Sequence, residues 1–172
     1  MNLKHKLHNP VFKVLHKTAI ETGTKAFVVG GFVRDILVKR PNKDIDIVVE
    51  GNGIDFAKKV ANKLENVRGL SVFKNFGTAM IKLDDYELEF VGARKESYRA
   101  ESRKPIVEDG SIAEDQERRD FTINAMSISL NDADFGELID PFGGQKDVVN
   151  GILKTPLHPD QTYSDDPLRM MR

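Results

Sequence analysis

A four-residue apolar run that ends in two glycines constrains the fold of this chain most. Residues 26–29 (Ala-Phe-Val-Val) precede Gly30-Gly31, and this pattern predicts a buried strand followed by a sharp turn. Residues 32–38 are then predicted to form a helix that ends near Pro41. Residues 44–49 (Asp-Ile-Asp-Ile-Val-Val) predict a second strand. A strand, a glycine turn, a helix and a second strand therefore form the expected centre of the fold.

Further helices and strands are expected on both sides of this centre. Residues 11–22 and 54–64 have apolar residues at helical spacing, so each predicts a helix. Three strands are expected at residues 70–73, 78–83 and 86–91. Asp84-Asp85 is the expected hairpin turn between the last two of these strands. The chain is therefore expected to be a mixed α+β protein.

The second half of the chain has weaker patterns. Residues 92–113 are rich in charge and lack periodicity, so a mobile loop is expected there. The remaining expected elements are a largely helical stretch at 114–125, short strands at 126–130 and 137–139, a turn at 140–144, a short helix at 145–150, and an extended piece or strand at 152–155. A last helix is expected to begin near Ser164 and to continue past Arg172, because its apolar residues have nothing to pack against.

The composition fits a globular protein: 172 residues, 40% hydrophobic and 31% charged. The chain has no cysteine, which excludes disulfides and thiolate metal sites and agrees with a cytoplasmic location. No apolar run approaches the roughly 20 residues that a bilayer requires, so no membrane partner is expected. The net charge of −1 argues against this chain gripping RNA alone, since most nucleic-acid binders carry a basic excess.

Two acidic residues on the second expected strand are the first candidates for chemistry. Side chains alternate along a strand, so Asp44 and Asp46 share one face while the isoleucines between and after them enter the core. Two carboxylates on one face suit Mg²⁺, with Mn²⁺ as a possible substitute. Glu89 is the candidate for a third metal ligand, although Glu87 shares its face. Without other signals, a half-exposed acidic strand would explain the pair better than a metal site.

The glycine turn shifts the interpretation toward nucleotide chemistry. Gly30 and Gly31 would let a phosphate approach the backbone at the start of a helix, where N–H groups and the helix dipole attract anions. Arg34 could add a bidentate phosphate contact, or could form only a surface ion pair with Asp35. Phosphate contacts beside a two-carboxylate metal site predict nucleotidyl transfer, in which one ion activates a 3′-hydroxyl and the other holds the triphosphate.

Polar residues at 118–124 offer further contacts for a ribonucleotide. Arg119 would suit a phosphate, and Asp120 and Asn124 would suit ribose hydroxyls. Asp120 and Asn124 are four residues apart, so they would share one face of a helix. A capped helix with a buried Arg–Asp pair would account for the same residues equally well.

The last motif, residues 164–172, has the chemistry to recognise a base. Ser164 or Asp165 can cap the expected helix, and Asp165 is also a candidate nucleotide contact. Asp166, Arg169 and Arg172 recur every three residues to form one stripe. A carboxylate beside a guanidinium places an acceptor next to a donor, which matches the pairing edges of cytosine and adenine. Guanine and uracil would leave the carboxylate facing an acceptor, and unpaired buried polar groups discriminate strongly. Such a helix would select C and A without a nucleic-acid template.

Five motifs in this order resemble the bacterial-type (class II) tRNA nucleotidyltransferase and poly(A) polymerase family. They are Gly-Gly-Phe-Val-Arg-Asp at 30–35, Asp-Ile-Asp at 44–46, Arg-Arg-Asp-Phe-Thr-Ile-Asn-Ala at 118–125, Asp-Pro-Phe-Gly-Gly at 140–144 and Asp-Asp-Pro-Leu-Arg at 165–169. The resemblance implies a polymerase-beta-like head at residues 1–155, with a mixed sheet of about five strands flanked by helices. It implies the start of a truncated helical neck at residues 156–172.

The resemblance also implies roles for individual residues. Asp44 and Asp46 match the metal carboxylates, and contacts to the nucleotide and its base are implied for Gly31, Arg34, Arg119, Asp166, Arg169 and Arg172. The implied activity is transfer of CMP and AMP from CTP and ATP to the 3′ end of tRNA. The parts of the family that hold tRNA are implied to lie outside this chain, and residues 92–113 are implied to help the pocket switch from C to A.

Three alternatives stay open. A poly(A) polymerase, or an enzyme that adds only C or only A, would have the same head. A non-catalytic nucleotide-binding module would keep the fold, although the intact acidic pair argues against it. A hydrolase with a histidine metal site is disfavoured, because His5, His8, His16 and His158 form no convincing ligand set.

Overall fold

A mixed sheet organises the chain. The computed structural model describes residues 1–99 and 102–172, with the side chains of residues 95–107 excluded. Seven of the described strands form one sheet in the order β3-β4-β5-β2-β1-β8-β9. These strands are β1 (Ala26–Val29), β2 (Asp44–Val49), β3 (Gly69–Phe73), β4 (Thr78–Lys82), β5 (Glu87–Gly92), β8 (Ser127–Ser129) and β9 (Leu138–Ile139). β2 and β5 are parallel and their neighbours are antiparallel. The predicted mixed sheet is confirmed, with β8 and β9 bringing it above the expected five strands.

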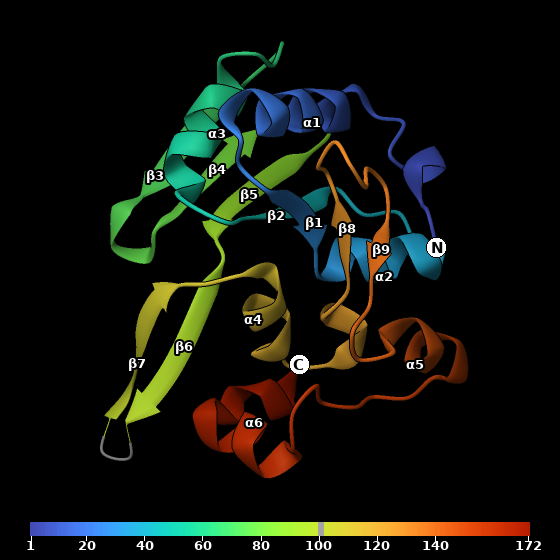
Figure 1. Cartoon of the computed structure of the whole chain (residues 1–172), viewed down its shortest axis with the longest axis vertical. Coiled ribbons are helices and arrows are strands. Elements are labelled where there is room, and N and C mark those ends of the chain that lie inside the picture. Colours follow the sequence, from blue (N-terminus) through green and yellow to red (C-terminus); the bar gives the residue numbers. More distant parts are fainter. Residues whose placement is uncertain (100–101) are drawn as a thin grey trace.

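The helices flank this sheet on both sides (Figure 1). The α-helices are α1 (Pro10–Thr22), α2 (Gly31–Leu37), α3 (Gly53–Ala61), α4 (Ile112–Glu117), α5 (Gly144–Asn150) and α6 (Pro159–Asp165). Short 3-10 helices are η1 (Lys4–Lys6), η2 (Lys74–Phe76), η3 (Thr122–Asn124) and η4 (Pro167–Met171). No helix in the described part of the chain has the length and apolar character needed to cross a membrane.

One face of the sheet packs against α1 and α3 to form the main core. Ile45, Ile47 and Phe90 point to this face and are fully buried. α1 begins where the Asn9 side chain accepts a hydrogen bond from the backbone N–H of Val11, and it ends at a left-handed glycine. The predicted amphipathic pattern of α3 is confirmed, since its apolar side chains enter this core.

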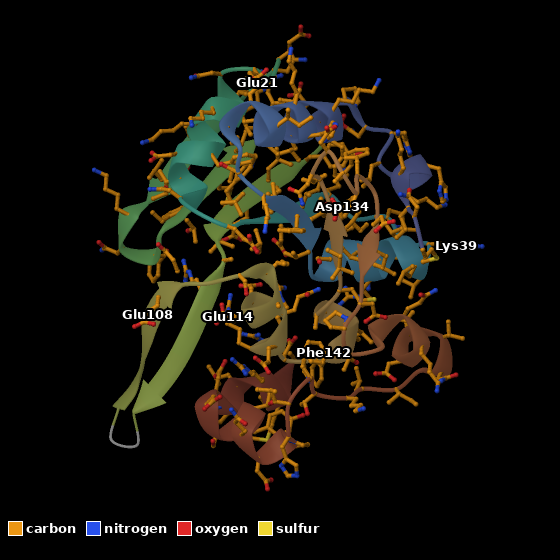
Figure 2. All side chains as sticks on the ribbon, viewed as in Figure 1. Glu21, Lys39, Glu108, Glu114, Asp134 and Phe142 are labelled. Atoms are coloured by element: carbon orange, nitrogen blue, oxygen red, sulfur yellow. The ribbon has the colours of Figure 1, made fainter. Side chains whose placement is uncertain are left out.

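The opposite face is covered over only part of its width. α4 contributes Ile112 to a second apolar cluster that includes Val29, Val48 and Ala93, so it covers β1 and β2. Figure 1 shows α4, α5 and α6 on this side, and Figure 2 shows the labelled Glu21 of α1 and Glu114 of α4 on opposite sides of the sheet. This partly open face carries the predicted acidic residues, because Asp46 alternates with the buried isoleucines of β2.

The expectation of a loop was wrong for most of the described part of residues 92–113. β6 (Arg94–Arg99) and β7 (Ser102–Asp109) form an antiparallel two-stranded sheet, and α4 begins at Ile112; residues 100–101 lie outside the described part. A two-stranded ladder pairs its backbone groups without needing a buried face. Apolar alternation therefore did not mark these strands in the sequence.

Two helical predictions also need correction. The helix expected at 114–125 ends at Glu117 and is followed by η3, because the Asp120 carboxylate accepts from the Phe121 backbone N–H and the Asn124 side-chain amide. The last helix begins at Pro159, not near Ser164, and is interrupted at Asp166. Asp166 has an extended backbone because a proline follows it. Residues 152–155 belong to no helix or strand.

Candidate active site

The glycine turn between β1 and α2 forms the floor of the site. Gly30 has φ +71°, a backbone conformation that favours glycine, so the sharp turn predicted after β1 is confirmed. A Cβ atom at Gly30 would lie 3.0 Å from Arg119 Nη1 and 3.2 Å from Asp46 Oδ2. Gly30 therefore leaves room for an arginine and a carboxylate that come from distant parts of the chain.

The acidic residues form a row across two parallel strands. Asp44 pairs with Glu87, and Asp46 pairs with Glu89, so all four side chains point to the open face. Glu87 forms an ion pair with Lys82 at 3.1 Å. Glu89 is exposed and has no ion-pair partner among the described residues, which makes it the better placed of the two as a third ligand.

Asp46 has the electrostatic character of a cation ligand. Burial raises the pKa of its carboxyl to about 6; Arg119 opposes this effect, and the nearby Glu89 and Asp44 add to it. The carboxylate form is therefore costly without a neighbouring positive charge. A divalent cation bound between Asp44 and Asp46 would relieve this repulsion.

The chemistry of these donors fits Mg²⁺, since all are carboxylate oxygens. Among the described residues, however, no three His, Cys, Asp or Glu side chains stand close enough to hold a metal by themselves. The paired aspartates thus offer a partial ligand set, and Glu89 as third ligand remains a prediction.

A buried aspartate of α4 that sequence reasoning missed holds Arg118 and Arg119, the two arginines that follow this helix. Asp115 is fully buried, and its carboxylate accepts from Arg119 Nη2 at 2.9 Å and Nε at 3.1 Å. The same carboxylate accepts from Arg118 Nε at 3.1 Å. Burial alone would raise the pKa of Asp115, but Arg119 and Arg118 hold it below its ordinary value. The spacing of Asp115 four residues before Arg119 was the available sequence signal.

Arg34 is tied into a network that links α2 to η3. Its Nε donates to the buried Asp35 at 2.9 Å, and its Nη1 donates to the Asn124 side-chain oxygen at 2.9 Å. Asn124 in turn donates to Asp120 at 3.1 Å. The Arg34–Asp35 ion pair, which the sequence left open as a surface pair, is present, but Asp35 is buried. The predicted proximity of Asp120 to Asn124 is confirmed without a continuous α-helix.

The last motif keeps its predicted stripe in a different helix type. In a 3-10 helix, side chains three residues apart are eclipsed, so Asp166, Arg169 and Arg172 remain on one side. Arg169 Nε lies 3.8 Å from Asp166 Oδ2, and Arg172 Nη1 lies 3.5 Å from Asp120 Oδ2. The stripe thus reaches the polar cluster that follows α4.

These elements surround one open pocket of about 1060 Å³. The predicted residues that line it are Gly30, Gly31, Arg34, Asp46, Arg119, Asp120, Asn124, Asp165, Asp166, Arg169 and Arg172. Asp44 and Glu89 lie outside this lining. Arg118, Ser164, Pro167 and Leu168 also line the pocket but were not predicted as site residues.

The Asp-Pro-Phe-Gly-Gly motif has a structural role beside the pocket. The Asp140 carboxylate accepts from the backbone N–H groups of Gly144 and Gln145 at the start of α5. A Cβ atom at Gly144 would lie only 2.2 Å from the Thr122 carbonyl oxygen. Gly144 therefore allows α5 to pack tightly against η3, which carries Asn124.

Residues 26–154 match the family model described as the poly A polymerase head domain. The chain belongs to this head-domain family. The match includes the glycine turn, the acidic pair and the Asp115–Arg119 segment.

Several members of this family resemble the chain closely. It is 46% identical over 150 residues to the A-adding tRNA nucleotidyltransferase of Aquifex aeolicus (strain VF5), which covers 86% of the chain and 18% of that protein. A CCA-adding enzyme solved in an apo form has a TM-score of 0.84 and 41% identity, covering 95% of the chain and 38% of the solved chain. A tRNA nucleotidyltransferase solved with a primer tRNA and an incoming ATP analog has a TM-score of 0.77 and 44% identity, with coverages of 92% and 42%. The chain thus spans less than half the length of each.

Proposed function

We propose that this chain is the catalytic head of a template-independent nucleotidyltransferase that adds CMP and AMP, from CTP and ATP, to the 3′ end of tRNA. The observation that carries this proposal is the single pocket shared by the glycine turn, Asp46, Arg119 and the Asp166–Arg169 pair. Phosphate-binding and base-binding groups face one cavity, as the reaction requires. The A-adding and CCA-adding relatives support the substrate class.

Different residues contact the triphosphate, the ribose and the base of the nucleotide. The backbone at Gly30 and Gly31 and the Arg119 guanidinium bind the triphosphate, because they meet at the turn beside Asp46. Asp120 and Asn124 orient the ribose, and Asp166 with Arg169 offers paired acceptor and donor groups to the base. Asp44 and Asp46, with Glu89 as a third ligand, would hold Mg²⁺ or Mn²⁺. The bound ion would supply activation of the 3′-hydroxyl and neutralisation of the triphosphate.

The chain is proposed to carry only part of the activity. The match to the family model ends at residue 154, which supports a head at residues 1–155 and a separate neck beginning at residue 156. The relatives are more than twice as long, which supports placing the main tRNA contacts in other parts of the protein. Action on tRNA and the absence of cysteine support a cytoplasmic location.

Calorimetric titration of the four ribonucleoside triphosphates with Mg²⁺ tests the nucleotide assignment. CTP and ATP should bind weakly, but still more tightly than GTP and UTP. In a separate assay, the chain alone should extend tRNA little or not at all. Asp46→Ala should abolish the Mg²⁺-dependent part of binding, whereas Asp132→Ala, whose side chain is 81% exposed, should not. Unchanged Mg²⁺-dependent binding in Asp46→Ala would exclude the catalytic assignment.

A second candidate is an enzyme that adds only A. The A-adding name of the Aquifex aeolicus relative, at 46% identity, favours it. Incorporation assays with the complete protein on tRNAs that end in CC, in C or in neither separate the candidates. Extension of only the CC-ending tRNA would identify an A-adding enzyme.

A further inference from the structure

A strip of exposed and half-buried side chains leads away from the acidic residues across the open face of the sheet. The strand registers place one residue from each of four adjacent strands in a row: Asp46, Glu89, Met80 and Ser71. Phe73 lies two residues further along β3 and therefore points to the same face. Phe76 follows in η2, directly after this strand.

The far end of the strip has the composition of a site for single-stranded nucleic acid. Phe73 is 43% exposed and Phe76 is 70% exposed, whereas most large apolar side chains of this sheet are buried. Lys74 lies between them, and Arg94 donates to the Phe76 carbonyl oxygen. Within the described residues, neither cation has an acidic partner, so their charges are available to phosphates. Exposed aromatic rings beside unpaired cations are the features that bind unpaired bases and their backbone.

The geometry of the reaction indicates which substrate binds along this strip, and this inference rests on the proposed function. In phosphoryl transfer, the attacking and leaving oxygens are roughly in line on opposite sides of the phosphorus. The pocket for the triphosphate is lined by Gly30, Arg119 and the last motif, all on one side of Asp46. The attacking 3′-hydroxyl must then approach from the other side, where β5 presents Glu89 and β4 presents Met80.

We propose that Phe73 and Phe76 form a stacking platform for the single-stranded 3′ tail of the acceptor RNA. Three strand spacings and two residues along β3 separate Asp46 from Phe73, which gives roughly 16 Å. Stacked bases rise about 3.4 Å each, so the platform meets the acceptor about four or five bases before its 3′ end. The terminal hydroxyl then lies at the carboxylates while the upstream bases rest on the rings.

Fluorescence anisotropy with two RNA probes tests the platform. The long probe is a labelled single-stranded RNA that ends in CC and spans the distance from Asp46 to Phe76, and the short probe is the dinucleotide CpC. Phe73→Ala/Phe76→Ala should weaken binding of the long probe at least about five-fold, corresponding to about 1 kcal/mol, the lower end for stacking one base on an aromatic ring. Binding of CpC and of ATP should stay unchanged, since neither reaches the platform.

Matched variants separate aromatic stacking from simple apolar contact. Phe76→Trp should retain binding of the long probe and Phe76→Leu should lose it. Equal binding by both would show that base stacking on an aromatic ring does not contribute, which would overturn the proposal. Val149→Ala, at an 80% exposed apolar residue of α5, should have no effect. The proposal also fails if the wild-type chain binds the long probe no more tightly than the double variant. ATP affinity, measured separately with Asp46→Ala, reports on the proposed function independently.

Discussion

Replacing Asp115 with asparagine should show how the two arginines that follow α4 are held. The substitution keeps the shape of the side chain but removes the charge that both Arg118 and Arg119 contact. Removing one member of a buried ion pair costs about 3–5 kcal/mol. The side chains of Arg118 and Arg119 are 27% and 18% exposed, so water restores part of their solvation. We therefore expect a loss of about 2–3 kcal/mol in the free energy of unfolding, below the fully buried range.

For a chain of this length, that loss corresponds to a fall in Tm of about 5–10 °C. The pKa of Asp115 is lowered in the folded state, so its contribution to stability is complete above the ordinary value of 3.8 and is lost as the pH falls through the folded-state pKa. The difference in Tm between wild type and Asp115→Asn should therefore be constant from pH 7 to pH 5 and shrink only in stronger acid.

Thermal unfolding followed by circular dichroism, together with ATP titration, provides the measurement. Arg119 without its anchor should bind the triphosphate more weakly, by about five-fold or more, as expected for a charge-assisted contact. Asp132→Asn, at an exposed position, is the control and should shift Tm by less than about 2 °C. A Tm within 2 °C of wild type and an unchanged ATP affinity in Asp115→Asn would refute the role of Asp115 in positioning Arg119.

Three further substitutions or conditions test the site. Gly30→Ala should reduce Mg²⁺-ATP affinity at least ten-fold, because the Cβ atom would contact Arg119 and Asp46. Gly23 has a similar positive φ, but a Cβ atom there would have nothing within 4 Å. Gly23→Ala should therefore lower stability without lowering affinity in the same titration. The Asp46 carboxyl should titrate near pH 6 by carbon NMR in the metal-free chain, and a titration near 3.8 would contradict the effect of burial. Because the folded state raises the pKa of this carboxyl, Mg²⁺-dependent ATP binding should weaken as the pH falls below about 6. Gly144→Ala should destabilise the chain by about 1–3 kcal/mol in urea unfolding, because its Cβ atom would overlap the Thr122 carbonyl. Gly69→Ala, with open space around it, should not destabilise the chain. Equal unfolding midpoints for the two variants would show that α5 and η3 adjust freely.

Local patterns were sufficient to predict most of the elements that carry the site. The apolar run before Gly30, the alternation in β2 and the spacing in α1 each depend on residues that are neighbours in the sequence. The same alternation predicted that Asp44 and Asp46 share one face of their strand and that Glu87 and Glu89 share one face of theirs. Patterns of this kind fail where the sequence of a strand lacks apolar alternation, as in β6 and β7, or where a side chain competes with the backbone, as Asp120 does before η3.

What the sequence alone determined about this protein was therefore the type of most elements and the identity of most pocket residues. Only the tertiary structure decided which side chains touch: Arg34 reaches Asn124 across 90 positions, Arg119 lies against Gly30 and Asp46, and Asp115 is buried between two arginines. These contacts depend on how α4 and η3 pack over the end of β1. Packing of separate elements is set by the whole core, so no local periodicity reports it.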